Sequence, residues 1–309
     1  MAQSIQDQIN EQMEERTENA TTDMATLPLL TDEAIRSDTR RTDIVEVNFS
    51  SQNARIVGTS DAPKLTLDVV REESAPIQPV KMVFDQQEYR VDVRMGVPFS
   101  VNARHSQLIQ RFNDLPDTPE NNAKRNRAVK NLYISEMIDN PKFSFDGQGE
   151  GRPIEDVSDV LADALFSAYV EKNQPEEDQI YQVTVLRGQP IHTAILLQDS
   201  FDAFPAPLQR DVHDMTQADI EATTQRSRKQ REILVSSMVF PEGFSFSLNG
   251  EGSEGELYPI EQVSELWLQA LHAAYRASNI PEVGLSMVSR FSVASTNSNG
   301  EETAVEGVS

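Results

Sequence analysis

Apolar residues recur every three or four positions in two stretches of the chain, and this spacing predicts two amphipathic helices. The apolar positions of the first stretch are Val157, Val160, Leu161, Ala164, Leu165 and Ala168. Those of the second stretch are Val263, Leu266, Trp267, Ala270, Leu271 and Ala274. Such spacing aligns one continuous apolar face along an α-helix. Each helix is therefore expected to pack one face against another element.

Short alternations of apolar and polar residues precede both helices and predict strands. They cover residues 81–84, 89–93 and 99–101 in the first half, and residues 181–185 and 191–197 in the second half. Gly96 and Pro98 punctuate the first set, as turns do between the strands of a small antiparallel sheet. A further helix with a basic start is expected in each half, ending at Pro141 and at Pro241.

The two halves share one pattern. The motif Tyr-x-Val-x-Val-x-x-Gly-x-Pro begins at Tyr89 and again at Tyr181, a separation of 181 − 89 = 92 residues. The motif Pro-Ile-Glu-x-Val-Ser begins at Pro153 and again at Pro259, a separation of 259 − 153 = 106 residues. Loops differ in length while the elements are kept, which indicates a tandem duplication. The predicted fold class is α+β, with two tandem copies of a small domain made of a short antiparallel sheet plus two helices.

The repeat sets the predicted domain boundaries, at residues 78–175 for the first copy and 176–281 for the second. Residues 1–77 are polar and acidic, so we expect a disordered acidic arm there. Residues 282–309 are expected to form a second disordered tail. The short apolar cluster at residues 27–30 fits either an incidental patch in the arm or a docking motif.

Charge narrows the class of partner. The formal net charge is −23, which argues against nucleic acid or an anionic membrane as the main partner, because phosphates are bound by clustered Lys and Arg. The chain lacks an apolar run long enough to span a bilayer and starts without the pattern of a secretory signal. A protein that stays in the cytoplasm and binds a basic or apolar protein partner is the expectation.

Candidate catalytic or metal-binding residues do not converge. The chain has no cysteine, so disulfides, thiol catalysis and thiolate metal sites are excluded. Its four histidines lie apart, at His105, His192, His213 and His272. The glycine-rich segments lack the Gly-Lys-Ser/Thr ending of a phosphate loop. The sequence therefore predicts no cofactor, no metal and no enzymatic activity.

The candidate partner-binding residues are basic side chains at the two helix starts and aromatic residues near the terminal helices. They are Arg125, Arg127, Lys130, Arg226, Arg228, Arg231, Tyr169, Trp267 and Tyr275. The cations either pair with the abundant carboxylates of the chain or form a docking edge for an acidic partner or a neighbouring subunit. Cations at a helix N-terminus oppose the macrodipole, which hints at an outside role. The aromatic residues are either core or anchors for a partner.

The order of elements in each half resembles the tail assembly chaperones of tailed bacteriophages. The passages that carry the resemblance are residues 125–141, Phe143 to Phe145, and residues 228–241, where a charged helix runs into an apolar end and a proline. The resemblance implies a non-catalytic assembly factor in the host bacterial cytoplasm that binds the tape measure protein, tail tube subunits, or both. The sheets and terminal helices would then form a groove for an amphipathic helix.

A fused tandem pair with a long acidic arm departs from the usual form of that family. A virion structural protein, such as a tail, neck or other capsid-associated component retained in the particle, is the alternative. Self-association of the chain is left open by the sequence. The assembly state separates the two functions, because a structural component builds a stable symmetric interface.

Overall fold

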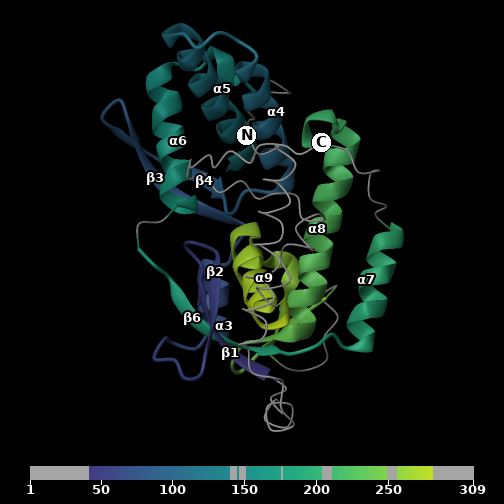
Figure 1. Cartoon of the computed structure of the whole chain (residues 1–309). Helices are drawn as coiled ribbons and strands as arrows, with labels where there is room; N and C mark the ends of the chain where they lie inside the picture. Colours follow the sequence, from purple (N-terminus) through teal and green to yellow (C-terminus); the bar gives the residue numbers. More distant parts are fainter. Residues whose placement is uncertain are drawn as a thin grey trace, which may run out of the picture. The chain divides into compact units, whose positions relative to one another are not determined.

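The computed structural model describes residues 42–139, 145, 151–174, 177–203, 211–248 and 256–280. All of them belong to a compact unit that begins at Arg41. This described part is α+β, with seven α-helices and three small sheets (Figure 1), so the broad fold class is confirmed. None of its helices is long and apolar enough to cross a membrane. Residues 1–41 and 281–309, which hold the first part of the predicted arm with the apolar cluster at 27–30 and the whole predicted C-terminal tail, lie outside the described residues.

The first half forms an antiparallel sheet in the order β3-β4-β5, with three helices around it. Its elements are β3 (Ile77–Phe84), β4 (Gln87–Arg94), α4 (Phe99–Asn113), α5 (Pro119–Met137), β5 (Ile138–Asp139) and α6 (Asp159–Asn173). Asp85 and Gln86 close the β3–β4 hairpin with positive φ angles of 50° and 62°, as in a type I′ turn. Val80 and Val91 lie opposite each other on the face that packs against α6.

The second half contributes one strand of ordinary length, three α-helices and several short strands. Its elements are β6 (Ile180–Leu186), α7 (Ile191–Ala203), α8 (Gln217–Met238), β7 (Val239–Phe240), β8 (Ser245–Ser247), β9 (Leu257–Pro259) and α9 (Glu265–Asn279). Strands β6 and β7 pair antiparallel, while β8 and β9 form a separate parallel pair. Trp267 of α9 lies in the core that this half builds.

The sheet of the second half is completed by residues that precede the first half. These residues form β1 (Thr42–Asn48), β2 (Asn53–Val57) and α3 (Leu67–Glu73). Strand β1 lies between β2 and β6, with Val45 opposite Val183. The ring of Phe49 lies 4.1 Å from that of Trp267, measured between centroids. The expectation of a disordered arm is therefore wrong for residues 42–77, because β1, β2 and α3 complete the core of the second half and Ile77 begins β3.

The physical reason for this error is the distance between partners in the sequence. Val45 and Val47 are fully buried, but alternate residues of β1 face outward and keep the segment polar on average. The strand that pairs with β1 begins at Ile180, more than a hundred residues further along the chain. Local composition therefore resembles that of an unfolded segment, although pairing with a distant strand stabilises it.

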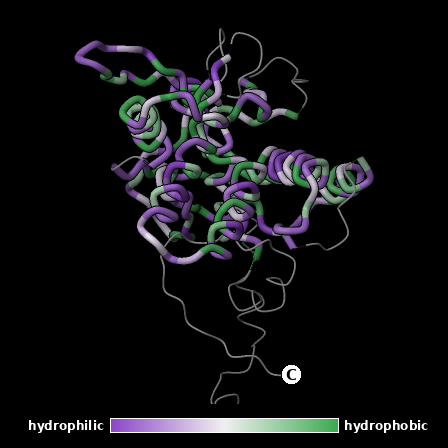
Figure 2. The backbone as a smooth tube through the Cα atoms, turned by 90° about the horizontal axis from the view of Figure 1, so that it is seen from above, coloured by the Kyte–Doolittle hydropathy of each residue, from purple (hydrophilic) through white to green (hydrophobic). Residues whose placement is uncertain are grey.

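The last predicted strand of each half, at residues 99–101 and 191–197, is wrong, because both segments are helices. Pro98 and Pro190 precede α4 and α7, and the backbone amide of Ala194 donates to the Pro190 carbonyl, as in a first helical turn. The alternation at residues 99–101 was too short to separate a strand from a helix. Each half thus carries three helices instead of two. Figure 2 shows apolar and polar positions mixed along these helices.

The same hydrogen bonds tie the last helix of each half to the turn after its central strand. Asn173 accepts from the Gly96 amide at 2.6 Å and donates to the Arg94 carbonyl at 3.1 Å. Asn279 accepts from the Gly188 amide at 2.7 Å and donates to the carbonyl of Leu186 at 3.0 Å. Both glycines have a φ of 82°, a region that glycine adopts without steric cost.

One of these turns is also where the two halves meet. A Cβ on Gly96 would lie 2.0 Å from the backbone nitrogen of Leu266, so the start of α9 packs directly on this turn. Gln269 of α9 donates to the Val97 carbonyl at 3.2 Å. Gly188 has no described atom within 4 Å of the same position. The contact accounts for a difference between matched helix positions, because Leu266 is buried whereas Val160 of α6 is 71% exposed.

Candidate protein-binding surface

Two of the predicted basic residues hold the same structural place in their halves. Arg127 of α5 donates to the Val157 carbonyl at 2.6 Å and pairs with Asp159. Arg228 of α8 donates to the Val263 carbonyl at 2.9 Å and pairs with Glu265 at 3.1 Å. Each arginine therefore ties the second long helix to the start of the terminal helix, which accounts for its presence without an outside partner.

The other four cations differ in their surroundings. Lys130 pairs with Asp163 at 2.5 Å, and Arg231 pairs with Glu265 at 2.6 Å. Burial lowers the pKa of Arg231, and Glu265 opposes that shift. The Arg226 guanidinium lies 4.3 Å above the centre of the Phe201 ring. No ion pair joins Arg125 to another described residue. A docking role for these cations stays a prediction.

The three candidate aromatic residues lie in or beside the cores. Trp267 is 1% exposed and Tyr169 is 4% exposed. The Tyr169 ring stacks on that of Tyr133 at 5.0 Å, and burial raises its pKa. Tyr275 is partly buried and stacks on His272 at 5.8 Å. The structure thus favours the core interpretation for Trp267 and Tyr169, since neither ring reaches the surface.

Helix α7 carries an exposed face that the sequence analysis missed. Ile191 is 81% exposed and Ile195 is 54% exposed, whereas Thr193 and Ser200 are buried. Asp199 and Asp202 are also exposed and follow Ile195 at the helical spacing of four and seven residues. We call these four residues, Ile191, Ile195, Asp199 and Asp202, the α7 surface. It is apolar in its first half and acidic in its second half.

The counterpart of α7 in the first half has no such exposed face. Helix α4 packs against both α5 and α8, while α7 packs against α8 (Figure 1). Gln107 of α4 donates to the carbonyls of Val212 and Met215, at 2.9 and 3.1 Å. The residue 92 positions later is Asp199, since 199 − 107 = 92, and an ionised carboxylate has no proton to donate. A second copy of the chain could not cover α7 with the same hydrogen bonds.

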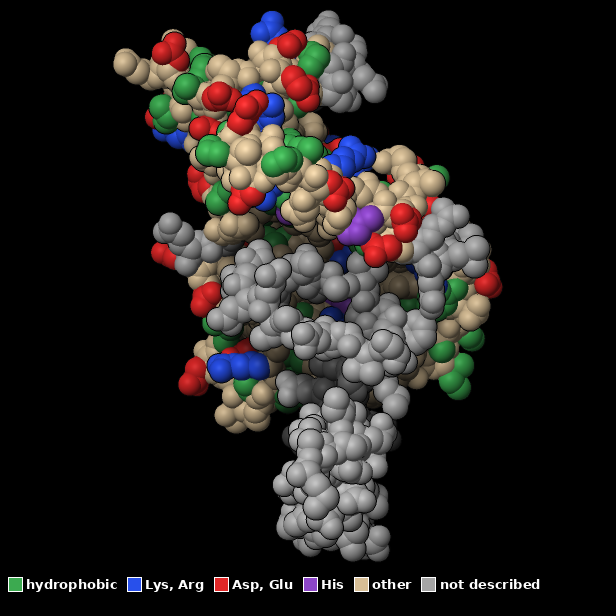
Figure 3. Space-filling model, turned by 45° about the horizontal axis from the view of Figure 1, so that its top comes forward, with side chains coloured by type: hydrophobic (Ala, Val, Ile, Leu, Met, Phe, Trp, Pro, Cys, Tyr) green, Lys and Arg blue, Asp and Glu red, His purple; other side chains and the backbone are tan. Residues whose placement is uncertain are grey.

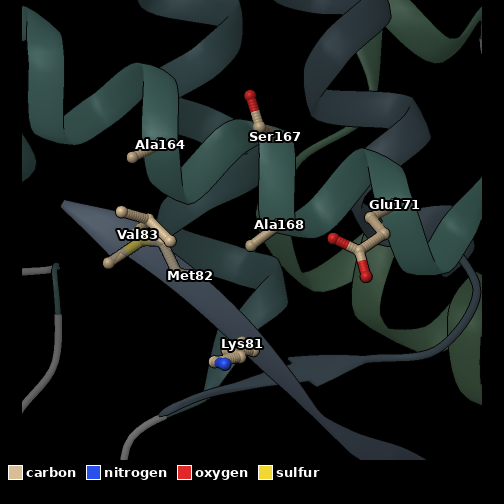
Figure 4. Close-up of a pocket in the computed structure, with 7 residues that line it drawn as sticks. All are labelled: Lys81, Met82, Val83, Ala164, Ser167, Ala168 and Glu171. Carbon is tan, nitrogen blue, oxygen red and sulfur yellow. The ribbon is translucent and has the colours of Figure 1, made fainter. Parts of the chain in front are cut away.

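A cavity of about 280 Å³ lies between β3 and α6 (Figure 4). Its walls are Lys81, Met82, Val83, Ala164, Ser167, Ala168 and Glu171. None of the three candidate aromatic anchors lines it, so the groove expected for an amphipathic helix stays a prediction. The side chains on the helix wall are mostly small, and the Lys81 and Glu171 charges stand at the rim.

On the face shown in Figure 3, acidic and basic side chains are interspersed. Among the described residues, no group of three His, Asp or Glu side chains could hold a metal ion.

The signal for the α7 surface was present in the sequence, because Ile191 and Ile195 stand four residues apart. The sequence analysis instead predicted a strand for residues 191–197, in which these two isoleucines would share one side of a sheet.

Comparisons with protein-family models, curated proteins and solved structures found no match.

Proposed function

We propose that this chain is a non-catalytic protein-binding factor that acts as a tail assembly chaperone of a tailed bacteriophage. In this proposal its partners are the tape measure protein and tail tube subunits, and it works in the host bacterial cytoplasm. Its two domains arose by tandem duplication, and its ends are acidic tails. The matched contacts of Asn173 with Asn279 and of Arg127 with Arg228 support the duplication.

The single observation that carries the binding role is the α7 surface. Exposed isoleucines on a helix whose polar Thr193 and Ser200 are buried reverse the usual pattern of a surface helix. Large exposed apolar side chains that cluster in this way mark an interaction site more often than isolated ones do. The reversal therefore supports a surface that a partner covers.

The chemistry of the α7 surface defines the partner. Ile191 and Ile195 fit the apolar stripe of an amphipathic helix, and Asp199 and Asp202 fit Lys or Arg side chains one or two turns further along. A long helical protein that exposes apolar stripes in water needs such a cover, and the net charge of −23 supports the solubility of the complex. The tape measure protein meets this description in the proposed system.

Co-expression of the full chain with the tape measure protein from the same source tests this function. We expect the two proteins to co-purify, and Ile195→Glu to lower the recovered partner at least about tenfold, since a charge in an apolar interface is unpaired. Val160→Glu, at a similarly exposed apolar position in the first domain, is the matched control and should leave recovery unchanged. Equal recovery with both variants, or a ring of the chain alone retained in finished particles, would overturn the proposal.

A further inference from the structure

The outer edge of β3 is free, because no described strand pairs with it. The type I′ hairpin fixes which backbone groups point outward. In a two-residue hairpin the residues next to the turn, Phe84 and Gln87, form a hydrogen-bonded pair, and such pairs alternate along the strands. Val80 and Met82 therefore bond to β4, while the backbone groups of Lys81 and Val83 point away from it. Pro79 also lies on the outward side, where a missing N–H leaves the ladder intact.

The second domain shows what occupies the same edge. Strand β1 pairs with β6 as β3 pairs with β4, since Val45 lies opposite Val183 and Val80 lies opposite Val91. The other edge of β1 is covered by β2, which packs on α9. Ala54 of β2 joins the core there. The first domain has no described strand in that place.

The cavity in Figure 4 lies where this missing strand would sit. Ala164 and Ala168 of α6 line it, and the matching residues of α9 are Ala270 and Ala274, since 270 − 164 = 274 − 168 = 106. Both α9 alanines are fully buried in the second half, whereas of their α6 counterparts Ala168 is 4% exposed and Ala164 is only partly buried. An added strand with a small apolar residue opposite Met82, as Ala54 lies opposite Val47, would fill this cavity.

Charge sets a further requirement on the added strand. At the matching place in the second domain, Glu46 of β1 lies directly opposite Arg55 of β2 and pairs with it at 2.6 Å. The first domain reverses the sign, because Lys81 takes the place of Glu46 and lies directly opposite Arg90. Lys81 pairs diagonally with Glu88 at 2.6 Å, and Arg90 pairs with Asp92 at 2.8 Å, so each of these cations has one carboxylate partner. A carboxylate on the added strand, directly opposite Lys81, would reproduce the pairing of Glu46 with Arg55 with the two charges exchanged.

We propose that the free edge of β3 and the groove on α6 bind an extended segment of a partner protein by β-strand addition. The segment pairs antiparallel with Lys81 and Val83, places a small apolar side chain over Ala164 and Ala168, and carries Asp or Glu opposite Lys81. This surface is separate from the α7 surface, so it stands whether or not the proposed chaperone function is correct. A second copy is a poorer occupant, because a β3–β3 pair centred on Lys81 would bring two lysines together.

A labelled peptide tests this site with the full chain. The probe has the sequence of residues 51–59, which includes β2, with the change Arg55→Glu, and the matched control probe keeps Arg55. Fluorescence anisotropy should show saturable binding of the Glu probe, about fivefold tighter than that of the Arg probe. Lys81→Glu should reverse this preference. A reversal is not expected if the peptides merely displace β2 from the second domain.

Backbone pairing is tested by Val83→Pro, which removes an outward N–H that the added strand needs. We expect at least about tenfold weaker binding of the Glu probe, with an unchanged circular dichroism spectrum and melting temperature. Glu120→Gln, at an exposed position of α5 that pairs with Lys124, is the control that leaves β3, β4 and α6 unchanged. Absence of saturable binding, or binding that neither Lys81→Glu nor Val83→Pro alters, would overturn the proposal. So would a dimer of the chain that Val83→Pro dissociates, because the occupant would then be a second copy.

Discussion

Replacing Gly96 by alanine is expected to destabilise the second domain much more than the same change at Gly188. Both glycines have a φ of 82°, so alanine at either place carries the same backbone penalty, about 1–2 kcal/mol. At Gly96 the new Cβ also lies 2.0 Å from the nitrogen of Leu266 and 2.6 Å from the carbonyl carbon of Glu265. These are backbone atoms, so the first turn of α9 has to move as a unit.

Such forced displacement of a packed element costs about 1–3 kcal/mol more, which gives a total of about 2–5 kcal/mol for Gly96→Ala. Gly188→Ala should stay near about 1–2 kcal/mol, because nothing described lies within 4 Å of its Cβ position. Urea unfolding measures the difference. The chain has one tryptophan, Trp267, and its contact with Phe49 makes its fluorescence report the second core.

The expected result is a lower midpoint for Gly96→Ala than for Gly188→Ala, with similar slopes, since both variants expose the same surface on unfolding. Equal midpoints would refute the reasoning. They would mean that the turn at Gly96 does not hold α9 and that the contact of α4 with α8 joins the halves instead.

Three further changes test the interior. Asn173→Ala should lower the free energy of unfolding by about 2–4 kcal/mol in urea titrations, because it leaves buried backbone groups unpaired. Glu265→Ala should lower the free energy of unfolding by about 3–5 kcal/mol, because it leaves Arg231 buried without its charge partner. The matched change Asp159→Ala removes a side chain that is 88% exposed and should lower it by less than about 1 kcal/mol. Burial lowers the pKa of His272 to about 3, with Arg231 adding to the shift, so this residue stabilises the fold above its unfolded pKa near 6.5. As the pH falls from 6.5 to 5, the free energy of unfolding of the wild type should drop by about 2 kcal/mol relative to that of His272→Phe. A constant difference between the two proteins over this range would contradict the prediction.

The sequence located the elements whose signals are local. The apolar faces at Leu161 to Ala168 and Trp267 to Ala274 gave α6 and α9, and the capping serines Ser158 and Ser264 fix their starts. The repeated Tyr-x-Val-x-Val motif gave β4 and β6. The basic segments located α5 and α8, but not their starts. Both helices begin earlier, at Pro119 and Gln217, so the cations lie within the helices and the predicted conflict with the macrodipole is wrong. Each of these signals rests on residues within one or two turns of a helix, or within one strand, and needs no knowledge of what packs against it.

The candidate sites were less accessible to such reasoning. Arg127 and Arg228 stood out as basic residues in an acidic chain, but their partners are carbonyls about 30 residues further on. The α7 surface was missed because residues 191–197 were predicted as a strand. Even a helix prediction would have placed Ile195 inside and Thr193 outside, and only burial in the folded chain shows the reverse.

The sequence by itself determined β4, β6, α5, α6, α8 and α9, because side-chain periodicity is a property of neighbouring residues. Only the tertiary structure decided that β1 completes the sheet of the second domain and that β3 keeps a free edge. Strand pairing between residues 45 and 183 depends on contacts that span more than a hundred residues. The free energy of that pairing comes from burying Val45 and Val47 beneath α9. No local pattern encodes which distant strand pairs with β1.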